Sequence, residues 1–453
     1  MKDGFVTGVN TAHRKNERGI TIVLVAISLL SLLGMAALAI DVSTLYMAHG
    51  EAQRAADAAA LAGARMFALS GYTSASSALA ASDICQTSAV PGAAAAANRQ
   101  AEAVAAQNLV AGQPAAVQSI TCTLTAANPQ IAVTVQRTAL PTFFGRIWGG
   151  TANSVTATAV AEAYNPSGSA APVQVQGVKP WLIPNCDPDP ANVTGPHDCA
   201  GAGLFVDPVD GSIKNNGSFV GKTITLTHLT SPGEPTVNAP GRTLDYYRLD
   251  VPIRPPEPVC PSTSVVGCSQ VGGDDYRDNI ACTSTFQFSC GQTVGAGQAV
   301  TVQTGGGMGP RTNEGTQCLI HASGRGPTLG QDELLPTGGA PDGTAPITIK
   351  GGDNNPNSAL QGVTSISRSD SIITVPIYHR AAAPPDDLCP AGCTLTGTIV
   401  GFLQLGIQEN VAGGPNGQVK GVIMNVAGCN PGAGNPVVSG GGVSPIPVRL
   451  IHQ

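Results

Sequence analysis

The chain has 453 residues and a net charge of −6, and only 11% of its side chains are charged, compared with about 25% in an average soluble domain. It has no basic patch and no stripe of aromatic and arginine residues, which argues against nucleic acid as a partner. Its 56 glycines and 35 prolines favour short strands joined by many turns.

An uncharged apolar run extends from Ile20 to Ile40 and is closed by Asp41. A helix of this length is about 31 Å long, which matches the hydrocarbon core of a bilayer. Four basic residues precede the run: Lys2, Arg14, Lys15 and Arg18. The positive-inside rule therefore predicts that residues 1–19 lie in the cytoplasm, that residues 20–40 form a transmembrane helix, and that everything after residue 41 lies outside the cytoplasm.

A cleaved secretory signal is the alternative, because Ala37–Ala39 fits the A-x-A cleavage pattern. The apolar run is longer than the usual signal core of about 7–15 residues, however, and no polar stretch separates it from the cleavage pattern. The sequence thus favours an uncleaved anchor. In either case most of the chain is exported.

Small apolar residues recur after this run at alternating steps of three and four, which is the spacing of a heptad seam. The seam consists of Leu45, Ala48, Ala52, Ala55, Ala59, Ala62, Met66 and Leu69. Alanine has the highest helix propensity and no proline interrupts residues 41–70, so we predict that the apolar helix continues as an alanine-rich helix. Asp41 and Tyr46 would mark the membrane exit, where the amphipathic ring of tyrosine is favoured.

Two interpretations of this seam stay open. Alanine allows another surface to approach closely, although each contact buries little area. The seam could pack on a sheet of the same chain, as most apolar stripes do. It could also pack laterally against other helices that emerge from the membrane.

Residues 71–165 are predicted to form a small α+β unit. A helix is expected over residues 98–110 with Asn98 as its cap, and residues 140–150 are expected to form a helix or turn. β-branched residues alternate in three stretches, which indicates strands: 119–126, 130–139 and 153–164. A long helix followed by a small antiparallel sheet is pilin-like by analogy. The composition of residues 166–177 is typical of a linker.

Residues 178–453 are predicted to form a mainly β domain. Its candidate strands are 223–229, 243–251, 299–304, 371–380, 397–411 and 418–428. Long stretches rich in Gly, Pro, Asn and Asp separate them. Short strands with many turns favour a β-sandwich or an irregular β domain, so the expected fold class of the whole chain is α+β.

All twelve cysteines follow the apolar run, which predicts disulfides in an oxidising compartment. Neighbours in sequence suggest the pairs Cys186/Cys199, Cys260/Cys268, Cys282/Cys290 and Cys389/Cys393. Cys85/Cys122 would link two parts of the region after the helix, and Cys318/Cys429 remain by elimination. The sequence does not prove this connectivity. A metal site of Cys186, His197 and Cys199 is the alternative, although its spacing fits no zinc pattern.

The N-terminal segment also resembles a known family. The resemblance is carried by Arg18-Gly19, Leu33-Gly34, Ala39-Ile40-Asp41-Val42, Leu45-Tyr46 and the stretch Gln53–Ala64. It resembles the N-terminal domain of TadG-like proteins of the Tad (Flp) pilus assembly system. The resemblance implies a bacterial inner-membrane anchor, a periplasmic body and a link to adhesive pili. It also implies two kinds of partner, the lipid bilayer and other pilus assembly or pseudopilin subunits.

Two departures from related patterns matter. Pilins are cut after a glycine and carry Glu at the fifth mature position, but here Leu24 is fifth after Gly19. We therefore expect no processing by prepilin peptidase. Many TadG-like proteins also carry a metal-binding DxSxS motif. The nearest match is Asp41-Val42-Ser43, which lies in the membrane exit, so we expect no metal-dependent adhesion site.

No enzyme motif is present: the sequence has no G-x-S-x-G, no H-E-x-x-H and no P-loop. His321 is close to Ser323, but adjacency in a glycine-rich loop does not make a triad. The acidic segments 186–189, 272–279 and 351–357 lack the ligand pattern of an EF-hand, and Asx-turns explain them more simply. We expect a protein that is not an enzyme and has no cofactor and no metal.

Two functional classes follow from these observations. The first is a membrane-anchored structural or assembly component of a pilus-type envelope apparatus. The second is a membrane-anchored periplasmic or surface module that binds a polysaccharide, an adhesive target or another partner.

Overall fold

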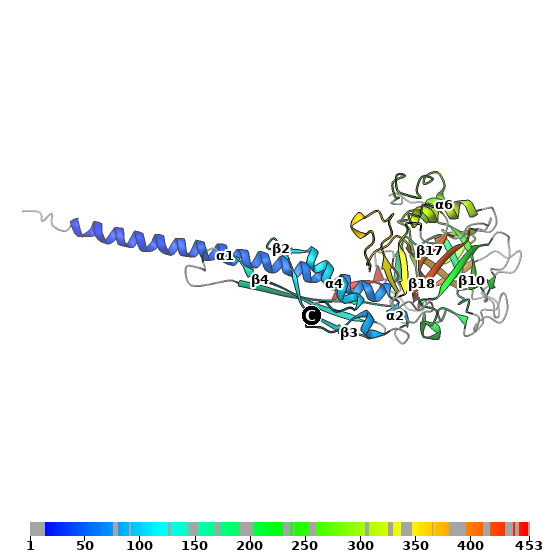
Figure 1. The fold of residues 1–453 in the computed structure, drawn as a ribbon, viewed down its shortest axis with the longest axis horizontal. Helices are drawn as coiled ribbons and strands as arrows, with labels where there is room; N and C mark the ends of the chain where they lie inside the picture. Colours follow the sequence, from blue (N-terminus) through cyan, green and yellow to red (C-terminus); the bar gives the residue numbers. More distant parts are fainter. Residues whose placement is uncertain are drawn as a thin grey trace, which may run out of the picture.

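The computed structural model describes most of the chain. The described residues are 14–75, 80–89, 92–125, 128–142, 144, 153–167, 173–189, 203–229, 236–238, 241–252, 260–303, 308–324, 329–336, 347–364, 366–379, 396–410, 417–430, 438–439 and 444–451. The molecule is elongated, with one long helix at one end and a compact group of strands at the other (Figure 1). We call these two parts the stalk and the head.

The stalk is built on α1, a continuous helix of 56 residues from Arg14 to Leu69. The predicted apolar and alanine-rich helices are thus one element, since no proline interrupts them. The first half of α1 projects beyond the rest of the molecule (Figure 1), and its large apolar side chains from Ile20 onward are exposed. It is the one helix among the described residues that is long and apolar enough to cross a membrane.

The second half of α1 packs against helix α4 (Ala96–Gln107) and a four-stranded sheet. This sheet is antiparallel, with the strand order β20-β5-β4-β3. Its strands are β3 (Ala116–Thr123), β4 (Gln130–Leu140), β5 (Asn153–Ala163) and β20 (Val448–Ile451). β3, β4 and β5 fall where alternation predicted them. The pilin-like label for this arrangement remains an interpretation.

The predicted helix cap at Asn98 is wrong. α4 begins two residues earlier, after Ala95, and Asn98 lies buried inside its first turn. There its side chain donates to the carbonyl of Gln86 at 2.7 Å and accepts from the backbone N–H of Gln86 at 2.9 Å. Asn98 therefore ties a separate segment to the helix. The predicted helix or turn at 140–150 lies almost wholly outside the described residues.

The head contains a closed barrel of six strands in the order β17-β16-β7-β10-β8-β18, with β18 pairing back to β17. These strands are β7 (Trp181–Pro184), β8 (Thr223–His228), β10 (Thr243–Asp250), β16 (Ile372–His379), β17 (Thr396–Asn410) and β18 (Val419–Gly428). Two of its pairings, β16 with β7 and β10 with β8, are parallel. The predicted sandwich is therefore replaced by a barrel, because the longest strand pairs with neighbours on both sides.

Smaller elements surround the barrel and the stalk. Helices α5 and α6 pack against each other beside the barrel, and short strands pair with barrel strands or form small separate sheets. The short helices are α2 (Tyr72–Ala75), α3 (Ala81–Ile84), α5 (Asp275–Ala281), α6 (Gly309–Leu319), η4 (Lys214–Gly217) and η5 (Ser358–Leu360). The short strands are β1 (Leu109–Val110), β2 (Gln113–Pro114), β6 (Val173–Gln176), β9 (Val237–Asn238), β11 (Gln287–Ser289), β12 (Thr293–Gly295), β13 (Thr301–Gln303), β14 (Glu333–Pro336), β15 (Ile347–Lys350) and β19 (Val438–Ser439).

The chain leaves the stalk for the head and then returns. β6 lies inside the stretch predicted as a linker and pairs with β11 and β19 of the head. After the head, the last strand β20 pairs with β5 of the stalk. Figure 1 accordingly places the C-terminus beside the stalk sheet. The stalk is thus made from both ends of the chain.

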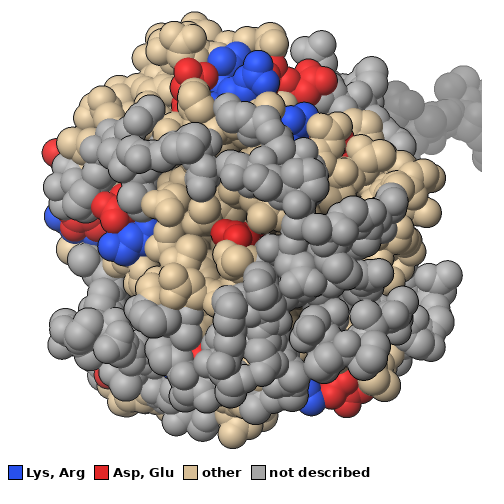
Figure 2. Space-filling view, turned by 90° about the vertical axis from the view of Figure 1, so that its right-hand side faces the viewer, with Lys and Arg blue, Asp and Glu red and all other residues tan. Residues whose placement is uncertain are grey.

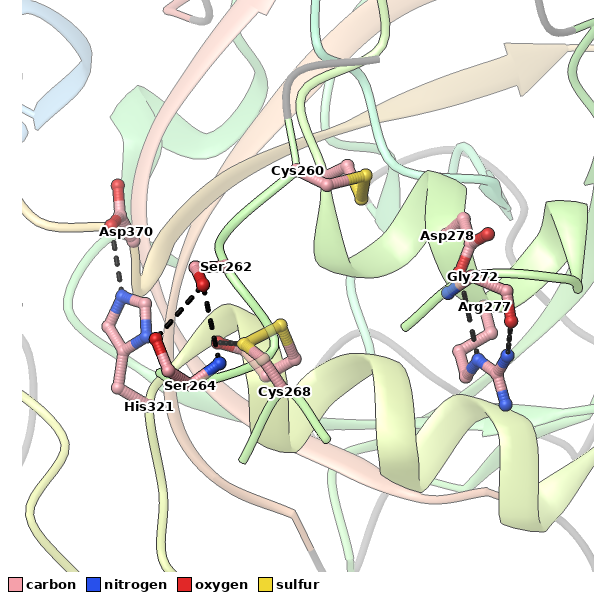
Figure 3. The surroundings of a disulfide bond; sticks show 11 residues. Cys260, Ser262, Ser264, Cys268, Gly272, Arg277, Asp278, His321 and Asp370 are labelled. Carbon is pink, nitrogen blue, oxygen red and sulfur yellow. Dashed lines mark hydrogen bonds and ion pairs between the residues drawn. A yellow bond between two sulfur atoms is a disulfide. The ribbon is translucent and has the colours of Figure 1, made fainter. Parts of the chain in front are cut away.

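The structure corrects three of the predicted disulfides. Cys85–Cys122 is confirmed, but the head contains Cys260–Cys282, Cys268–Cys318 and Cys290–Cys429. The predicted pairs Cys260/Cys268, Cys282/Cys290 and Cys318/Cys429 are wrong. The packing of α5 against α6 places Cys282 and Cys318 beside the loop that carries Cys260 and Cys268, and Cys290 instead pairs with Cys429 after β18. Figure 3 shows Cys260 and Cys268 in this region. Cys186 is disulfide-bonded, which argues against the metal alternative. His197, Cys199, Cys389 and Cys393 lie outside the described residues.

His228 is a buried histidine at the end of barrel strand β8. Its ring lies 5.6 Å from the ring of Tyr246, measured between centroids, and neither ring nitrogen has a hydrogen-bond partner among the described residues. Burial, together with the charge of Arg248, lowers the pKa of His228 to about 4 from 6.5. The folded head therefore holds this imidazole neutral.

The stability of the head is expected to fall as the pH drops from 6.5 to 4. Between these pH values the unfolded chain is protonated on His228 while the folded chain is not. The free energy of unfolding is therefore expected to be lower by about 3 kcal/mol at pH 4 than above pH 6.5. Thermal or chemical unfolding of the full-length chain in detergent at several pH values measures this loss. His228→Phe should remove that part of the pH dependence. An unchanged dependence in this variant would contradict the assignment.

Candidate functional site

The alanine seam of α1 faces the interior of the stalk. Six of its eight members are buried, and Leu45 and Ala62 are half-buried. The buried members are Ala48, Ala52, Ala55, Ala59, Met66 and Leu69. A second row beside the seam is buried as well, namely Ala56, Ala60 and Ala64. The buried face is thus wider than the heptad predicted, because α1 contacts two surfaces.

These two surfaces are the stalk sheet and helix α4. α1 contacts β4, β5 and β20 of the sheet, and also α4. Gly63 shows how closely these elements approach: a Cβ there would lie 2.7 Å from Cδ1 of Ile131 in β4 and 3.3 Å from the carbonyl oxygen of Ala97 in α4. Within one chain, small residues therefore bring α1 against its own sheet and helix.

The predicted membrane-exit residues lie at the near end of this packed region. The carboxylate of Asp41 accepts a hydrogen bond from the backbone N–H of Phe144, with Oδ2 at 3.1 Å. Asp41 therefore fixes part of the β4–β5 connection to the helix at the end of the apolar run. Tyr46 and Met47 are 75% and 69% exposed. The surface of α1 is thus apolar for some residues beyond Asp41.

A buried polar cluster joins the stalk to the head. The side-chain amide of Asn425 in β18 donates to the carbonyl of Ala68 at 2.7 Å and to the hydroxyl of Thr73 at 3.0 Å, and its oxygen accepts from Ser74. Asn165, at the end of β5, donates to Val426 O at 3.0 Å and to Thr73 O at 3.2 Å. All these side chains are buried.

The turn between α1 and α2 also depends on a close approach to the barrel. Gly71 has a φ of +77°, and a Cβ there would lie 2.3 Å from Cγ1 of Val220 and 2.5 Å from the carbonyl oxygen of Met424. Only glycine combines this backbone conformation with this contact. The end of α1 is therefore seated directly on strand β18.

A cleft of about 440 Å³ lies where the last turns of α1 meet the head, and Arg65, Lys179, His321, Arg368 and Asp370 are among the residues that line it. Nε2 of His321 lies 3.0 Å from Oδ2 of Asp370 (Figure 3). The hydroxyl of Ser323, which neighbours His321 in sequence, instead donates to the carbonyl of Leu329. The structure therefore forms a His–Asp pair without Ser323.

Sequence reasoning missed Lys179, the most deeply buried of these charged groups. Its side chain is 4% exposed, and its ammonium donates to the carbonyl of Cys282 at 2.8 Å. Burial lowers the pKa of Lys179 to about 7, and the charge of Asp370 partly opposes that shift. The available signal was a single lysine within the apolar segment 178–183.

The acidic segments that superficially resemble calcium loops make other contacts. Arg242 forms ion pairs with Asp187 and Asp189. Asp274 caps α5 by accepting from the backbone N–H of Arg277. The side chain of Asn357 accepts from Ala359 N, as in an Asx-turn. Within the described ranges, no group of three or more His, Cys, Asp or Glu side chains could hold a metal.

The comparison with protein families matches the N-terminal part of the chain. Residues 19–66 match the family described as putative Flp pilus-assembly TadE/G-like, so this segment of α1 is similar to a domain of the pilus-assembly class. The match is consistent with a TadG-like protein of the Tad system. A search of curated proteins found no match, and a search of solved structures found none either.

Enlarging a seam residue is expected to destabilise the stalk. Ala59 is fully buried, so Ala59→Leu should force the sheet or α4 away and cost about 1–3 kcal/mol. Unfolding of the full-length chain in detergent, followed by circular dichroism, measures the effect. Ala58→Leu is the matched control, because Ala58 is half-buried one position away. Equal losses in the two variants would contradict a specific packing face.

Removing the central amide of the stalk–head cluster is expected to destabilise the protein as well. Asn425→Ala would leave Ala68 O and the Ser74 hydroxyl without this partner, at a cost of about 2–3 kcal/mol. Differential scanning calorimetry of the full-length chain tests this. Asn357→Ala, which removes an exposed turn contact, should cost less than about 1 kcal/mol. If Asn425→Ala lowers the stability no more than Asn357→Ala does, the cluster does not stabilise the stalk–head junction.

Proposed function

We propose that the protein is a membrane-anchored structural or assembly component of a Tad (Flp) type pilus or a related envelope apparatus. The observation that carries the proposal is the coincidence of the family match at residues 19–66 with α1. The same helix exposes its large apolar residues from Ile20 to Ile40 and buries its alanine face from Ala48 onward. A helix of this kind can lie in a bilayer at one end and carry a folded body at the other.

We also propose the orientation of this anchor in the inner membrane. The basic flank before residue 19 favours a cytoplasmic N-terminus, and the disulfides beyond the helix favour an oxidising compartment such as the periplasm. The head and the stalk sheet would then both be periplasmic. On this proposal the lipid bilayer is the first partner and other pilus-system subunits are the second.

On this proposal, exposed residues of α1 just beyond the membrane exit contact other subunits. Tyr46 and Met47 lie on α1 next to Ala48, whose side chain is buried against the stalk. Exposed apolar side chains beside a membrane segment suit lateral packing between neighbouring helices. The seam itself packs against the chain's own strands, so it is not available for lateral packing against other helices. On this proposal, the exposed surface at Tyr46 and Met47 makes those lateral contacts instead.

The role proposed here is structural and not enzymatic. Its support is that Ser323 is held in a turn away from His321, while His321 pairs with Asp370. The end of the head that faces away from the stalk shows basic side chains beside acidic ones, with no described region of a single charge (Figure 2). The cleft at the stalk–head junction is the observation that favours the alternative, a binding or adhesion module.

In-membrane photo-crosslinking tests the assembly proposal. A benzophenone amino acid at Met47 is expected to form adducts with other pilus-system proteins, because this side chain is exposed at the membrane exit. Val209 in the head is a control of similar exposure, 79% against 69%, and should not yield the same adducts. Mass spectrometry identifies the partners. Adducts only with glycan or with unrelated envelope proteins would favour the binding module instead.

A further inference from the structure

The cleft between stalk and head brings together charged groups from distant parts of the chain. Arg65 belongs to α1 of the stalk, Lys179 precedes barrel strand β7, and Arg368 and Asp370 precede β16. His321 follows α6. Only folding of the head onto the stalk forms this cleft, so its charge balance is a property of the assembled chain.

The lining has more positive than negative groups. Asp370 is the one acidic side chain among the described residues that line the cleft. A hydrogen bond from His321 lowers the pKa of Asp370, and the charges of His321, Arg368 and Lys179 add to that effect. A single carboxylate therefore faces two arginines, a lysine and a histidine.

The cationic side chains of this cleft have few hydrogen-bond or ion-pair partners among the described residues. Arg65 and Arg368 are both solvent-exposed and have no ion pair or hydrogen bond among the described residues. Desolvation, together with the charge of Arg368, lowers the pKa of Arg65. Lys179 uses one of its three donors, on Cys282 O. His321 is 5% exposed, and its Nδ1 has no partner in the described part of the chain. The unused donors on the buried side chains of Lys179 and His321 fit an acceptor that comes from outside the chain, and the two exposed arginines are free to contact it.

We propose that this cleft binds an oxyanion, a carboxylate or phosphate group, held between Arg65 of the stalk and Arg368 and Lys179 of the head. Planar guanidinium groups match the geometry of both anions. Arg65 lies 25 residues beyond Ile40 along α1, about 37 Å at the rise of an α-helix. Headgroups of the membrane in which residues 20–40 would lie are therefore out of reach. The bound group would come from a soluble ligand or from a partner in the periplasm.

Anion-dependent thermal stability of the full-length chain in detergent micelles tests this site. The probes are sodium phosphate and sodium glucuronate, each compared with sodium chloride at equal ionic strength and at pH 6.5, where Lys179 is mostly protonated. At least one of the two is expected to raise the midpoint of unfolding above its value in chloride. A larger effect of phosphate identifies a phosphate ligand, and a larger effect of glucuronate identifies a carboxylate.

Variants separate a specific site from general salt effects. Arg65→Gln and Arg368→Gln are each expected to weaken the apparent affinity about tenfold, since each removes a charged donor, and the double variant should abolish the response. Arg54→Gln removes the same charge from an exposed position on the same helix and should leave the response unchanged. In chloride alone, Arg65→Gln should not lower the midpoint, because it relieves repulsion from Arg368.

Two results would overturn the proposal. The first is that the midpoint of thermal unfolding is no higher in phosphate or in glucuronate than in chloride. The other is a stabilisation that persists in the double variant, which would mean that the anions act away from the cleft. Neither result bears on the crosslinks expected from Met47, so this site and the assembly role can fail separately.

Discussion

The close approach of α1 to its own sheet and to α4 is the contact on which the rest of the structure depends. Alanine and glycine side chains are too small to bury much area individually, yet they let three elements meet along more than four turns of helix. The first half of α1 projects beyond the rest of the molecule (Figure 1), so within the described chain the helix is held only along its second half. This packing therefore fixes the direction of α1, and with it the position of everything carried at its far end.

The head depends on the same helix through a different kind of contact. Asn425 and Asn165 satisfy backbone carbonyls at the end of α1 and in α2, and Gly71 brings the turn between these helices against β18. Buried amides impose one geometry because each needs its partners at defined positions. The stalk is thus held internally by apolar packing, whereas its attachment to the head relies on directional hydrogen bonds.

The sequence predicted those helices and strands whose residue pattern repeats along a single segment. Alternating β-branched residues located β3, β4 and β5, and alanine content located the second half of α1. Sequence reasoning failed where partners are distant. The pairing of β17 with β18 on one side and β16 on the other closes the barrel, and no local pattern records that closure. The cysteines failed for the same reason: Cys282 pairs with Cys260 across α5 instead of with its neighbour Cys290.

The candidate site shows the same division. The heptad identified Ala52, Ala55 and Ala59 because one stripe of small residues suffices to signal a buried face. It missed Ala56 and Ala60, because a second surface covers the adjacent row. The charged cleft has no sequence signature, since Arg65, Lys179 and Arg368 are separated by more than a hundred residues and meet only in the folded chain.

Because β20 pairs with β5, the stalk sheet combines strands that lie before and after the head in the sequence. The stalk sheet includes residues 448–451, which follow the head in the sequence, while its other three strands are complete before residue 170. The head is therefore an insertion within the stalk sheet, and it is synthesised before the strand that completes that sheet. Without β20, the long strand β5 would become an edge of the sheet beside α1, and long exposed edges pair readily with other chains. The short strand β20 thus protects β5 and replaces a long edge with a four-residue one.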